Sequence, residues 1–278
     1  MADAPTVDEL LQLRFDDASQ NVPDAPDVGQ WHAIANHQSC RSYTDMPISA
    51  ELVRQLCALA LSSPTKSDLQ QRDIIIVDAP EKRATINELF PNSAWIADAP
   101  VFLVFCGNNR RLRQIHEYHG HPFENDHLDA FFNAGVDAGI ALSAFVTAAD
   151  AAGLGTCPIS TIRDHLETVN DLLELPDWVF PVAGMTLGWP GRSPRVNLRL
   201  PLEATVHTDT YNEGVQAGAI EAYDARRAEL RPYSSQRDPD RFGTRTPYTW
   251  SEDKARQYAE PQRTDFGAYI RKKGFDLS

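Results

Sequence analysis

The segment His37-Gln38-Ser39-Cys40-Arg41 places an imidazole, a hydroxyl and a guanidinium at alternate positions, His37, Ser39 and Arg41. In extended backbone, residues two apart point to the same side. The three side chains can therefore bind a compact anion such as a phosphomonoester. The same residue types are common in solvated loops, so this segment alone leaves both interpretations open.

Two segments further along the chain carry groups that suit the same anion. The run Ser62-Ser-Pro-Thr-Lys-Ser-Asp-Leu-Gln70 follows one predicted helix after the first segment and is rich in hydrogen-bond donors. Arg195 and Arg199 follow the run Gly188-Trp-Pro-Gly191. We predict that these segments together hold a phosphate-bearing cofactor. For residues 62–70 the alternative is a turn between a helix and a strand, for which Pro, Ser and Asp are typical.

The composition limits the classes of partner. The chain has 278 residues and a formal net charge of −13. Such an acidic chain has no general affinity for nucleic acid or anionic membranes, so we expect neither as a partner. Any anion site must then be a local concentration of positive charge. Hydrophobic residues make up 42% and charged residues 23%, which is typical of a soluble globular protein.

The cysteines and the apolar stretches predict a cytoplasmic protein. The cysteines form no CxxC pair, which excludes a zinc ribbon and indicates free thiols in a reducing compartment. They are Cys40, Cys57, Cys106 and Cys157. The first residues have neither the basic nor the apolar region of a signal peptide. Residues 131–154, the most apolar stretch, are interrupted by Asn133, Asp137 and Asp150, so we expect a buried helix rather than a membrane span.

Apolar residues recur at helical and at strand spacing along the chain, which predicts an α+β fold. Strands are expected at residues 72–78, 101–106, 154–158 and 178–188. Helices are expected from Ser49 as N-cap to a stop at Pro64, and at residues 28–36, 80–89, 131–152, 162–173, 213–229 and 254–273. No linker interrupts the pattern, so residues 30–278 are predicted to form one domain. Residues 1–29 are acidic, and we expect a solvated arm with a short helix at Val7–Phe15.

The order of these motifs resembles that of the FMN-dependent nitroreductase and flavin-reductase family, and most closely the NADPH-preferring, oxygen-insensitive nitroreductases. The resemblance runs from about His37 to the C-terminus and rests on segments that are weakly specific alone but keep their order. They are His37–Arg41 with Pro47-Ile-Ser49, residues 62–70, Gly153-Leu-Gly155 with Pro158-Ile-Ser-Thr-Ile-Arg163, Leu187-Gly-Trp-Pro190, and Arg199-Leu-Pro201 with His207 and Tyr211. The resemblance implies a nitroreductase-like fold: a central mixed β-sheet flanked by helices, in a homodimer with an extended C-terminal segment.

The resemblance also implies how FMN is bound. His37 and Ser39 would bind its phosphate together with Arg199. Arg41 would lie near the pyrimidine edge of the ring or along the ribityl chain, where a cation stabilises the negative charge that reduced flavin carries. Further contacts to the cofactor would come from Thr65, Lys66, Ser67, Gln70, Pro158, Ile159, Ser160 and Thr161.

Two positions depart from the family pattern. Asn197 stands where a lysine often helps to hold the phosphate, and Arg195 would take its place. Ser160 and Thr161 stand where the family commonly has two glycines near flavin N5. Their Cβ atoms restrict the backbone and narrow the pocket, so the second departure bears on the substrate class more than on the cofactor.

Two further clusters of charged residues have a functional and a plain interpretation. Arg237, Arg241 and Arg245 are evenly spaced, and the resemblance implies that they bind the 2′-phosphate of NADPH. The alternative is a solvated loop that Asp238 and Asp240 partly neutralise.

The histidine-rich run His116-Glu-Tyr-His119-Gly-His121, with Glu124 and His127, lacks the HExxH spacing. We therefore predict no metal site there and expect a lid or a solvated loop.

The function that follows is that of an FMN-dependent NAD(P)H oxidoreductase. NADPH or NADH would give hydride to the flavin, and a nitroaromatic, quinone or similar small acceptor would then take it in a ping-pong scheme. No side-chain nucleophile is evident, and Arg41 would act only as an electrostatic stabiliser. The alternatives are a reductive dehalogenase or enone reductase of the same fold, or a flavin-binding protein without turnover.

Overall fold

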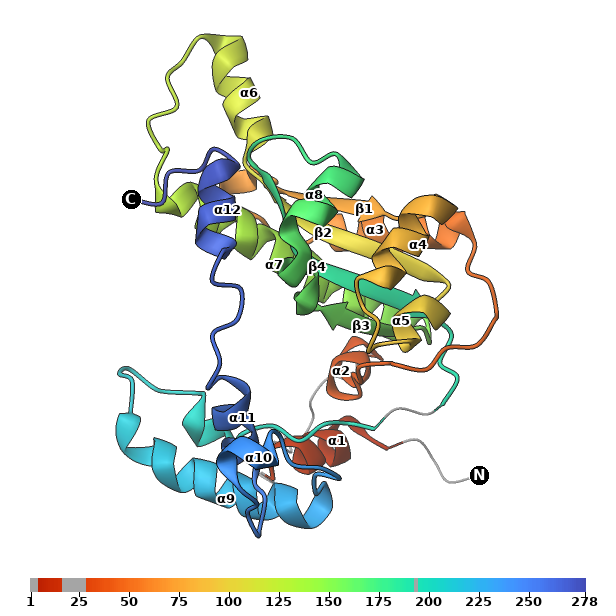
Figure 1. Cartoon of the computed structure of the whole chain (residues 1–278), viewed down its shortest axis with the longest axis vertical. Coiled ribbons are helices and arrows are strands. Elements are labelled where there is room, and N and C mark those ends of the chain that lie inside the picture. The colour runs from red at the N-terminus through yellow and green to blue at the C-terminus, as the bar shows by residue number, and fades with distance from the viewer. Residues whose placement is uncertain (1–4, 17–28, 193–194) are drawn as a thin grey trace. The chain divides into compact units, whose positions relative to one another are not determined.

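The computed structural model describes residues 5–16, 29–192 and 195–278 (Figure 1). By their contacts these residues form two compact units. The sheet unit comprises residues 37–192 and 263–278, and the helical unit comprises residues 5–16, 29–36 and 195–262.

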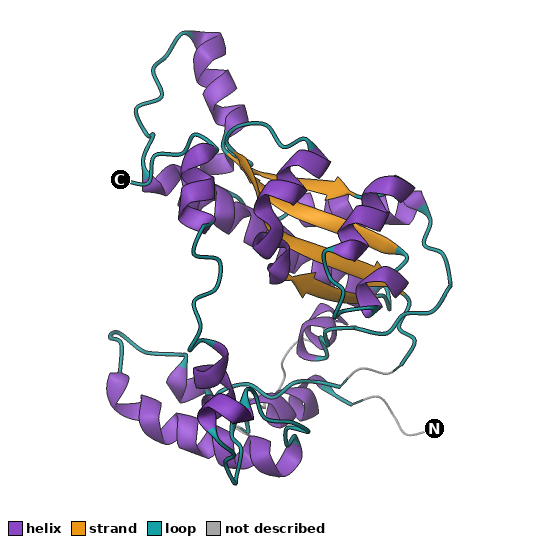
Figure 2. Ribbon diagram, viewed as in Figure 1, coloured by secondary structure: helices purple, strands orange, loops and turns teal. Residues whose placement is uncertain are grey.

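The sheet unit is built on four strands: β1 Arg72–Ile76, β2 Val101–Asn108, β3 Gly155–Ile159 and β4 Val179–Gly188. Their order is β1-β2-β4-β3, and helices cover both faces of the sheet (Figure 2). This confirms the α+β prediction. The prediction of a mixed sheet was wrong, because all three pairs of these strands are antiparallel. Among the described residues the parallel pairing is limited to an isolated bridge between Ser39 and Thr156.

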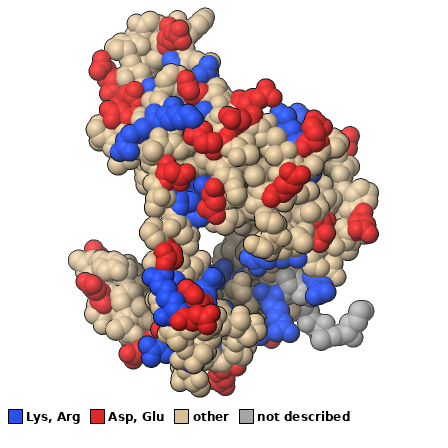
Figure 3. All heavy atoms as spheres, viewed as in Figure 1, with Lys and Arg blue, Asp and Glu red and all other residues tan. Residues whose placement is uncertain are grey.

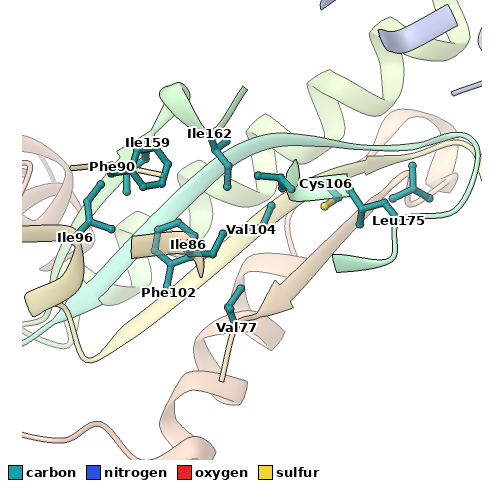
Figure 4. Packing of buried hydrophobic residues seen from close by; sticks show 12 residues of the cluster. Val77, Ile86, Phe90, Ile96, Phe102, Val104, Cys106, Ile159, Ile162 and Leu175 are labelled. Atoms are coloured by element: carbon teal, nitrogen blue, oxygen red, sulfur yellow. The ribbon is translucent and has the colours of Figure 1, made fainter. Parts of the chain in front are cut away.

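The central strand β2 divides the core into two layers because alternate side chains point to opposite faces. Phe102 and Val104 pack in a cluster with Ile86 of helix α4, Pro80–Glu88 (Figure 4). Leu103 and Phe105 pack on the other face against helices α3, Ala50–Leu61, and α7, Leu128–Ala151. The remaining helices of this unit are α5 Trp95–Asp98, α6 Arg110–His119, α8 Leu166–Leu173 and α12 Phe266–Lys272, with 3-10 turns at Lys66–Asp68 and Ser160–His165.

Helix α7 is the central helix of the sheet unit. Its length and composition would also suit a membrane span. Here Ala141 and Phe145 are fully buried in the cluster that α7 forms with α3 and the sheet, as expected of a core helix. Ala134, also fully buried, packs in a second cluster with Phe180 of β4. The opposite side of α7 exposes Phe132 and Val136.

Local chemistry explains where several elements begin and end. The Ser49 hydroxyl accepts a hydrogen bond from the N–H of Leu52 at 3.2 Å, so the predicted N-cap of α3 is confirmed. Helix α6 was not predicted, because the segment was interpreted as a lid or solvated loop from its histidines, two of which, His116 and His119, lie within the helix. The helix is followed by Gly120 in a left-handed conformation, which ends it. The single helix predicted for residues 254–273 was wrong. The chain instead forms α11, Trp250–Gln257, and α12, with Pro261 between them.

The helical unit contains α1 Val7–Phe15, α2 Gly29–Ala35, α9 Gln216–Leu230, α10 Pro239–Phe242 and α11, with 3-10 turns at Leu202–Ala204 and Glu213–Val215. The short helix predicted at Val7–Phe15 is confirmed, and Thr6 and Glu9 form a capping box at its start. Leu10 of α1 is buried in a small cluster with Ala35 and Val196.

Candidate functional site

The segment that carries His37, Ser39 and Arg41 is fixed along strand β3. Ser39 forms the parallel bridge with Thr156, and the N–H of Cys40 donates to the carbonyl of Thr156 at 2.7 Å. The two backbones come very close at Gly155, where an added Cβ would lie 2.6 Å from the side chain of Cys40. The extended backbone expected for this segment is therefore present at Ser39.

The imidazole of His37 is oriented by a carboxylate. Its Nδ1 lies 2.7 Å from Oδ2 of Asp150, which is in the last turn of α7. Both side chains are largely buried, with 24% and 13% of their surface exposed. Because Nδ1 is occupied by Asp150, an anion can be bound by this ring only through Nε2.

The guanidinium of Arg41 meets an aromatic ring and a thiol. Its central carbon lies 5.7 Å from the centroid of the Trp95 ring, within range of a cation–π interaction. The positive charge of Arg41 also lies close enough to the thiol of Cys157 to act on it. Burial raises the pKa of this thiol, and the positive charge of Arg41 opposes the increase. Besides packing against the core, Trp95 therefore contacts Arg41, the predicted stabilising cation.

The loop with Thr65, Lys66, Ser67 and Gln70 has an unusual backbone. Ser67 and Gln70 have φ values of +48° and +52°, in the left-handed region that non-glycine residues rarely adopt. The Thr65 hydroxyl accepts a hydrogen bond from the N–H of Gln70 at 3.3 Å. The side chains of Lys66, Ser67 and Gln70 are exposed, and the ammonium of Lys66 lies 4.0 Å from a carboxylate oxygen of Asp129.

The segment from Pro158 to Thr161 lies at the end of β3 and the start of the following 3-10 turn. Ile159 is 5% exposed and packs in the core, so only its backbone could contact a ligand. Pro158, Ser160 and Thr161 are exposed. The sheet unit thus carries the predicted site residues from 37 to 161, and the bridge at Thr156 joins the first and last of these segments directly.

The predicted phosphate ligands Arg195 and Arg199 belong to the helical unit, so their convergence with His37 stays a prediction. Both are exposed. The backbone N–H of Arg199 donates to the carbonyl of Arg14 at 2.8 Å, which fixes this strand-like segment against α1.

Each arginine predicted to bind NADPH is paired with a carboxylate of the helical unit. Arg237 lies 3.1 Å from Asp253, Arg245 lies 3.8 Å from Glu252, and Arg241 pairs with Glu260. These partners come from α11 and the residues just after it, rather than from Asp238 and Asp240. A 2′-phosphate at this loop would have to compete with internal carboxylates.

The histidine-rich segment is used for local structure. The ring of His116 bonds the carbonyl of Pro122 at 2.9 Å, and His127 caps the start of α7. Arg113 stabilises the following loop. Its two terminal nitrogens donate to the two carboxylate oxygens of Asp126, and its central carbon lies 4.6 Å from the centroid of the Phe123 ring. Among residues 5–16, 29–192 and 195–278, no group of three or more His, Cys, Asp or Glu side chains could hold a metal ion.

Two carboxylates at this site, Asp137 and Asp150, escaped the sequence analysis. In the sequence both appear only as polar interruptions of an apolar stretch. An acidic residue at a buried helical position requires a polar partner, and this was the available signal. On the face shown in Figure 3, basic and acidic side chains are mixed.

Comparison with known proteins gives consistent matches over almost the whole chain. A sequence profile of the nitroreductase family matches residues 34–189, and a profile of that family's C-terminal domain matches residues 197–278. The NAD(P)H FMN reductase of Bacillus subtilis is 35% identical over 248 residues, covering 88% of this chain and 97% of that protein. The oxygen-insensitive NADPH nitroreductase of Salmonella typhimurium is 29% identical over 245 residues, covering 87% and 96%. The solved structure of NfrA2 from B. megaterium has a TM-score of 0.81 and 34% identity, covering 90% of this chain and 99% of that one.

Proposed function

Because the chain belongs to the nitroreductase family, we propose that it is an FMN-dependent NAD(P)H oxidoreductase acting on small electron acceptors such as nitroaromatics or quinones. The observation that carries the proposal is the bridge between Ser39 and Thr156. It sets the anion-binding segment beside the strand that ends at Pro158–Thr161. The donor set of imidazole, hydroxyl and guanidinium fits a phosphate-bearing flavin. When bound, FMN would supply the chemistry of hydride transfer from NADPH or NADH to the acceptor, in a ping-pong scheme.

The chain itself binds and orients the cofactor. Ser39 would donate from its hydroxyl to the phosphate, and His37 would donate from Nε2 while its Nδ1 is bound by Asp150. Arg195 and Arg199 are proposed as further phosphate ligands, and Lys66, Ser67 and Gln70 as donors along the cofactor. All of these groups position the cofactor, and none needs to form a covalent bond.

Arg41 supplies the electrostatic part of the mechanism. Its guanidinium lies against the Trp95 ring and close to the Cys157 thiol. Because the cation is already in place, the side chain needs little reorganisation when negative charge develops at the pyrimidine edge of the reduced cofactor. A fixed cation at that edge lowers the energy of the reduced form and of the transition state that leads to it. We therefore assign Arg41 as the electrostatic stabiliser.

A homodimer is the proposed assembly. Leu128, Phe132 and Val136 are spaced four residues apart on α7 and are 49%, 61% and 41% exposed. Gly135 and Gly139 have open space at the position of a Cβ, so neither packs against a neighbour within the sheet unit. An apolar stripe with small residues on a core helix suits close packing against a second copy of the chain.

We also propose a cytoplasmic location. All four cysteines are free thiols, and Cys40, Cys106 and Cys157 are buried. Free thiols are typical of proteins kept in a reducing compartment. Cell fractionation with a periplasmic and a cytoplasmic marker enzyme would test this.

Reductive dehalogenation or enone reduction is the second candidate. Ser160 and Thr161 favour it because their side chains are exposed at the end of β3, where they add bulk and hydroxyl donors beside the substrate. These donors could favour a carbonyl or halide over a flat nitroaromatic ring. A flavin-binding protein without turnover is the third candidate.

The decisive experiment is purification followed by anaerobic reduction. The protein should be yellow or become so with added FMN, and NADPH or NADH should bleach it. Steady-state rates with a nitrofuran, a quinone, a haloaromatic and an enone then identify the acceptor class. A colourless protein that FMN cannot reconstitute would end the proposal, whereas bound flavin that neither coenzyme bleaches would favour a binding role.

A further inference from the structure

A single carboxylate holds both ends of the loop that carries Thr65, Lys66, Ser67 and Gln70. Asp137 lies on α7 and is fully buried. Its Oδ1 accepts the backbone N–H of Lys66 at 3.0 Å, and its Oδ2 accepts the backbone N–H of Gln71 at 3.0 Å. The two oxygens of one side chain therefore fix Lys66, near the start of the loop, and Gln71, just after its end.

The backbone between these two contacts is strained. Ser67, Asp68 and Gln70 all have positive φ, at +48°, +56° and +52°. None of them is glycine, so each conformation is unfavourable and persists only where the surroundings impose it. The hydrogen bonds of Asp137 are the buried interactions that impose it here. Strain of this kind is typical of segments that must present groups to a ligand.

A buried cation supports the other side of the same loop. Arg72 is 4% exposed and donates to the carbonyls of Leu61 at 2.8 Å, Ser63 at 2.8 Å and Pro64 at 3.1 Å. Burial lowers the pKa of Arg72, and the charge of Asp137 opposes this decrease. The two buried charges therefore compensate each other.

Both charges act only on the backbone of the loop. The side chains of Lys66, Ser67 and Gln70 are left exposed. Beyond the loop, the side chain of Gln71 is fixed by Asn109, whose Nδ2 donates to Oε1 of Gln71 at 2.7 Å. The arrangement presents a set of donors on a backbone that cannot easily relax.

We propose that Asp137 and Arg72 are positioning residues that hold residues 65–70 in their cofactor-binding conformation. The role as a cofactor loop rests on the proposed function, but the clamp itself does not. Removing the carboxylate would leave the amides of Lys66 and Gln71 without their acceptors and the charge of Arg72 without compensation. The loop would then leave the strained conformation.

The test is Asp137→Asn, which keeps the size of the side chain. Its amide can accept one of the two N–H groups but turns a donor towards the other. Two quantities are measured: the rate at which trypsin cuts the native, FMN-free protein after the exposed Lys66, and the dissociation constant of FMN. We expect faster cleavage at Lys66 and FMN binding weakened about 10- to 100-fold, the effect of losing a hydrogen bond to a charged group. The matched control is Phe145→Leu, a fully buried α7 residue on the sheet-facing side, which should lower Tm without changing either quantity.

The outcomes separate the clamp from the proposed function. Unchanged cleavage and unchanged FMN affinity in Asp137→Asn would overturn the clamp while leaving the function intact. Faster cleavage in a protein that binds no FMN even as wild type would support the clamp and refute the function. If the variant does not fold, amide hydrogen exchange of the wild type decides: the Lys66 amide should exchange much more slowly than that of Ser67. Equal exchange at these two amides would overturn the proposal.

Discussion

Nδ1 of His37 lies 2.7 Å from the carboxylate of Asp150, at the point where α7 ends beside the anion-binding segment. This pair sets which nitrogen of the ring can meet a phosphate. It also joins a residue of the predicted site to the last turn of the core helix, 113 positions away. The cofactor proposal therefore makes a direct prediction about Asp150.

Asp150→Ala should weaken FMN more than riboflavin. Without the carboxylate the ring loses its fixed orientation, and only the phosphate senses this change. We expect FMN affinity to fall about 10-fold, as for one lost hydrogen bond to a charged group, and riboflavin affinity to stay within about 2-fold. Fluorescence titration with both flavins measures the ratio. Asp171→Asn, an exposed carboxylate on α8, is the control and should leave both affinities unchanged. An equal loss for both flavins would show that Asp150 does not act through the phosphate.

Arg41→Gln should slow the reduction of bound flavin by NADPH. The neutral amide cannot stabilise the charge that develops at the pyrimidine edge, and one such donor is typically worth about 100- to 1,000-fold in rate. Trp95→Leu should have a smaller effect, because it removes only the ring that flanks the cation. Stopped-flow absorbance separates this rate from cofactor affinity. Arg54→Gln, on the exposed side of α3, is the control. A reduction rate unchanged by Arg41→Gln would remove this residue from the mechanism.

The regular elements were predictable because they depend on local patterns. β2 is apolar from Val101 to Cys106 and is buried on both faces, and Ser49 caps α3 as its sequence indicates. The antiparallel direction of every strand pair is a property of chain connections and could not be read from any one strand. Helix α6 was missed because its polar residues outnumber its apolar ones and none of its residues is buried.

The side chains that donate to the proposed cofactor were predictable from the sequence, but the residues that orient them were not. His37, Ser39 and Arg41 are spaced for extended backbone, and the bridge of Ser39 to Thr156 fits that spacing. The partners of these residues come from distant parts of the chain, as Asp150 does for His37. Such pairs depend on how α7 packs, and a single sequence contains no direct signal of it.

Alkaline pH should destabilise the fold through its buried thiols. Burial raises the pKa of Cys106 and of Cys157, and both are at most 2% exposed. In the unfolded chain a thiol ionises near pH 8.5, so above that pH the unfolded state binds fewer protons than the folded state and stability falls. The contribution of these thiols to the free energy of unfolding should therefore be constant below about pH 8 and fall by about 1 kcal/mol per thiol by about pH 9.5. Urea unfolding at several pH values measures this. Cys106→Ala should flatten the decline, and a decline as steep as that of the wild type would contradict the assignment.

Phe132→Glu should separate the proposed dimer. A charge in the centre of the α7 stripe cannot be buried against a second copy without a large cost in desolvation. Light scattering after size exclusion should give the mass of one chain for this variant and of two for the wild type. Met46→Glu, at a residue that is 55% exposed and outside the stripe, is the control and should stay dimeric. A wild-type protein that is monomeric at every concentration would refute the proposed assembly.

The enzyme should prefer NADPH over NADH only weakly. Arg237, Arg241 and Arg245 are each paired with a carboxylate, so a 2′-phosphate gains an arginine only by displacing an acidic group. We expect kcat/KM for NADPH to exceed that for NADH by about 10-fold or less, because the 2′-phosphate would gain at most one charge-assisted hydrogen bond. Glu260→Gln releases Arg241 and should raise kcat/KM for NADPH alone, whereas Arg241→Ala should lower it alone. Equal effects of both variants on NADPH and NADH would show that this loop does not contact the 2′-phosphate.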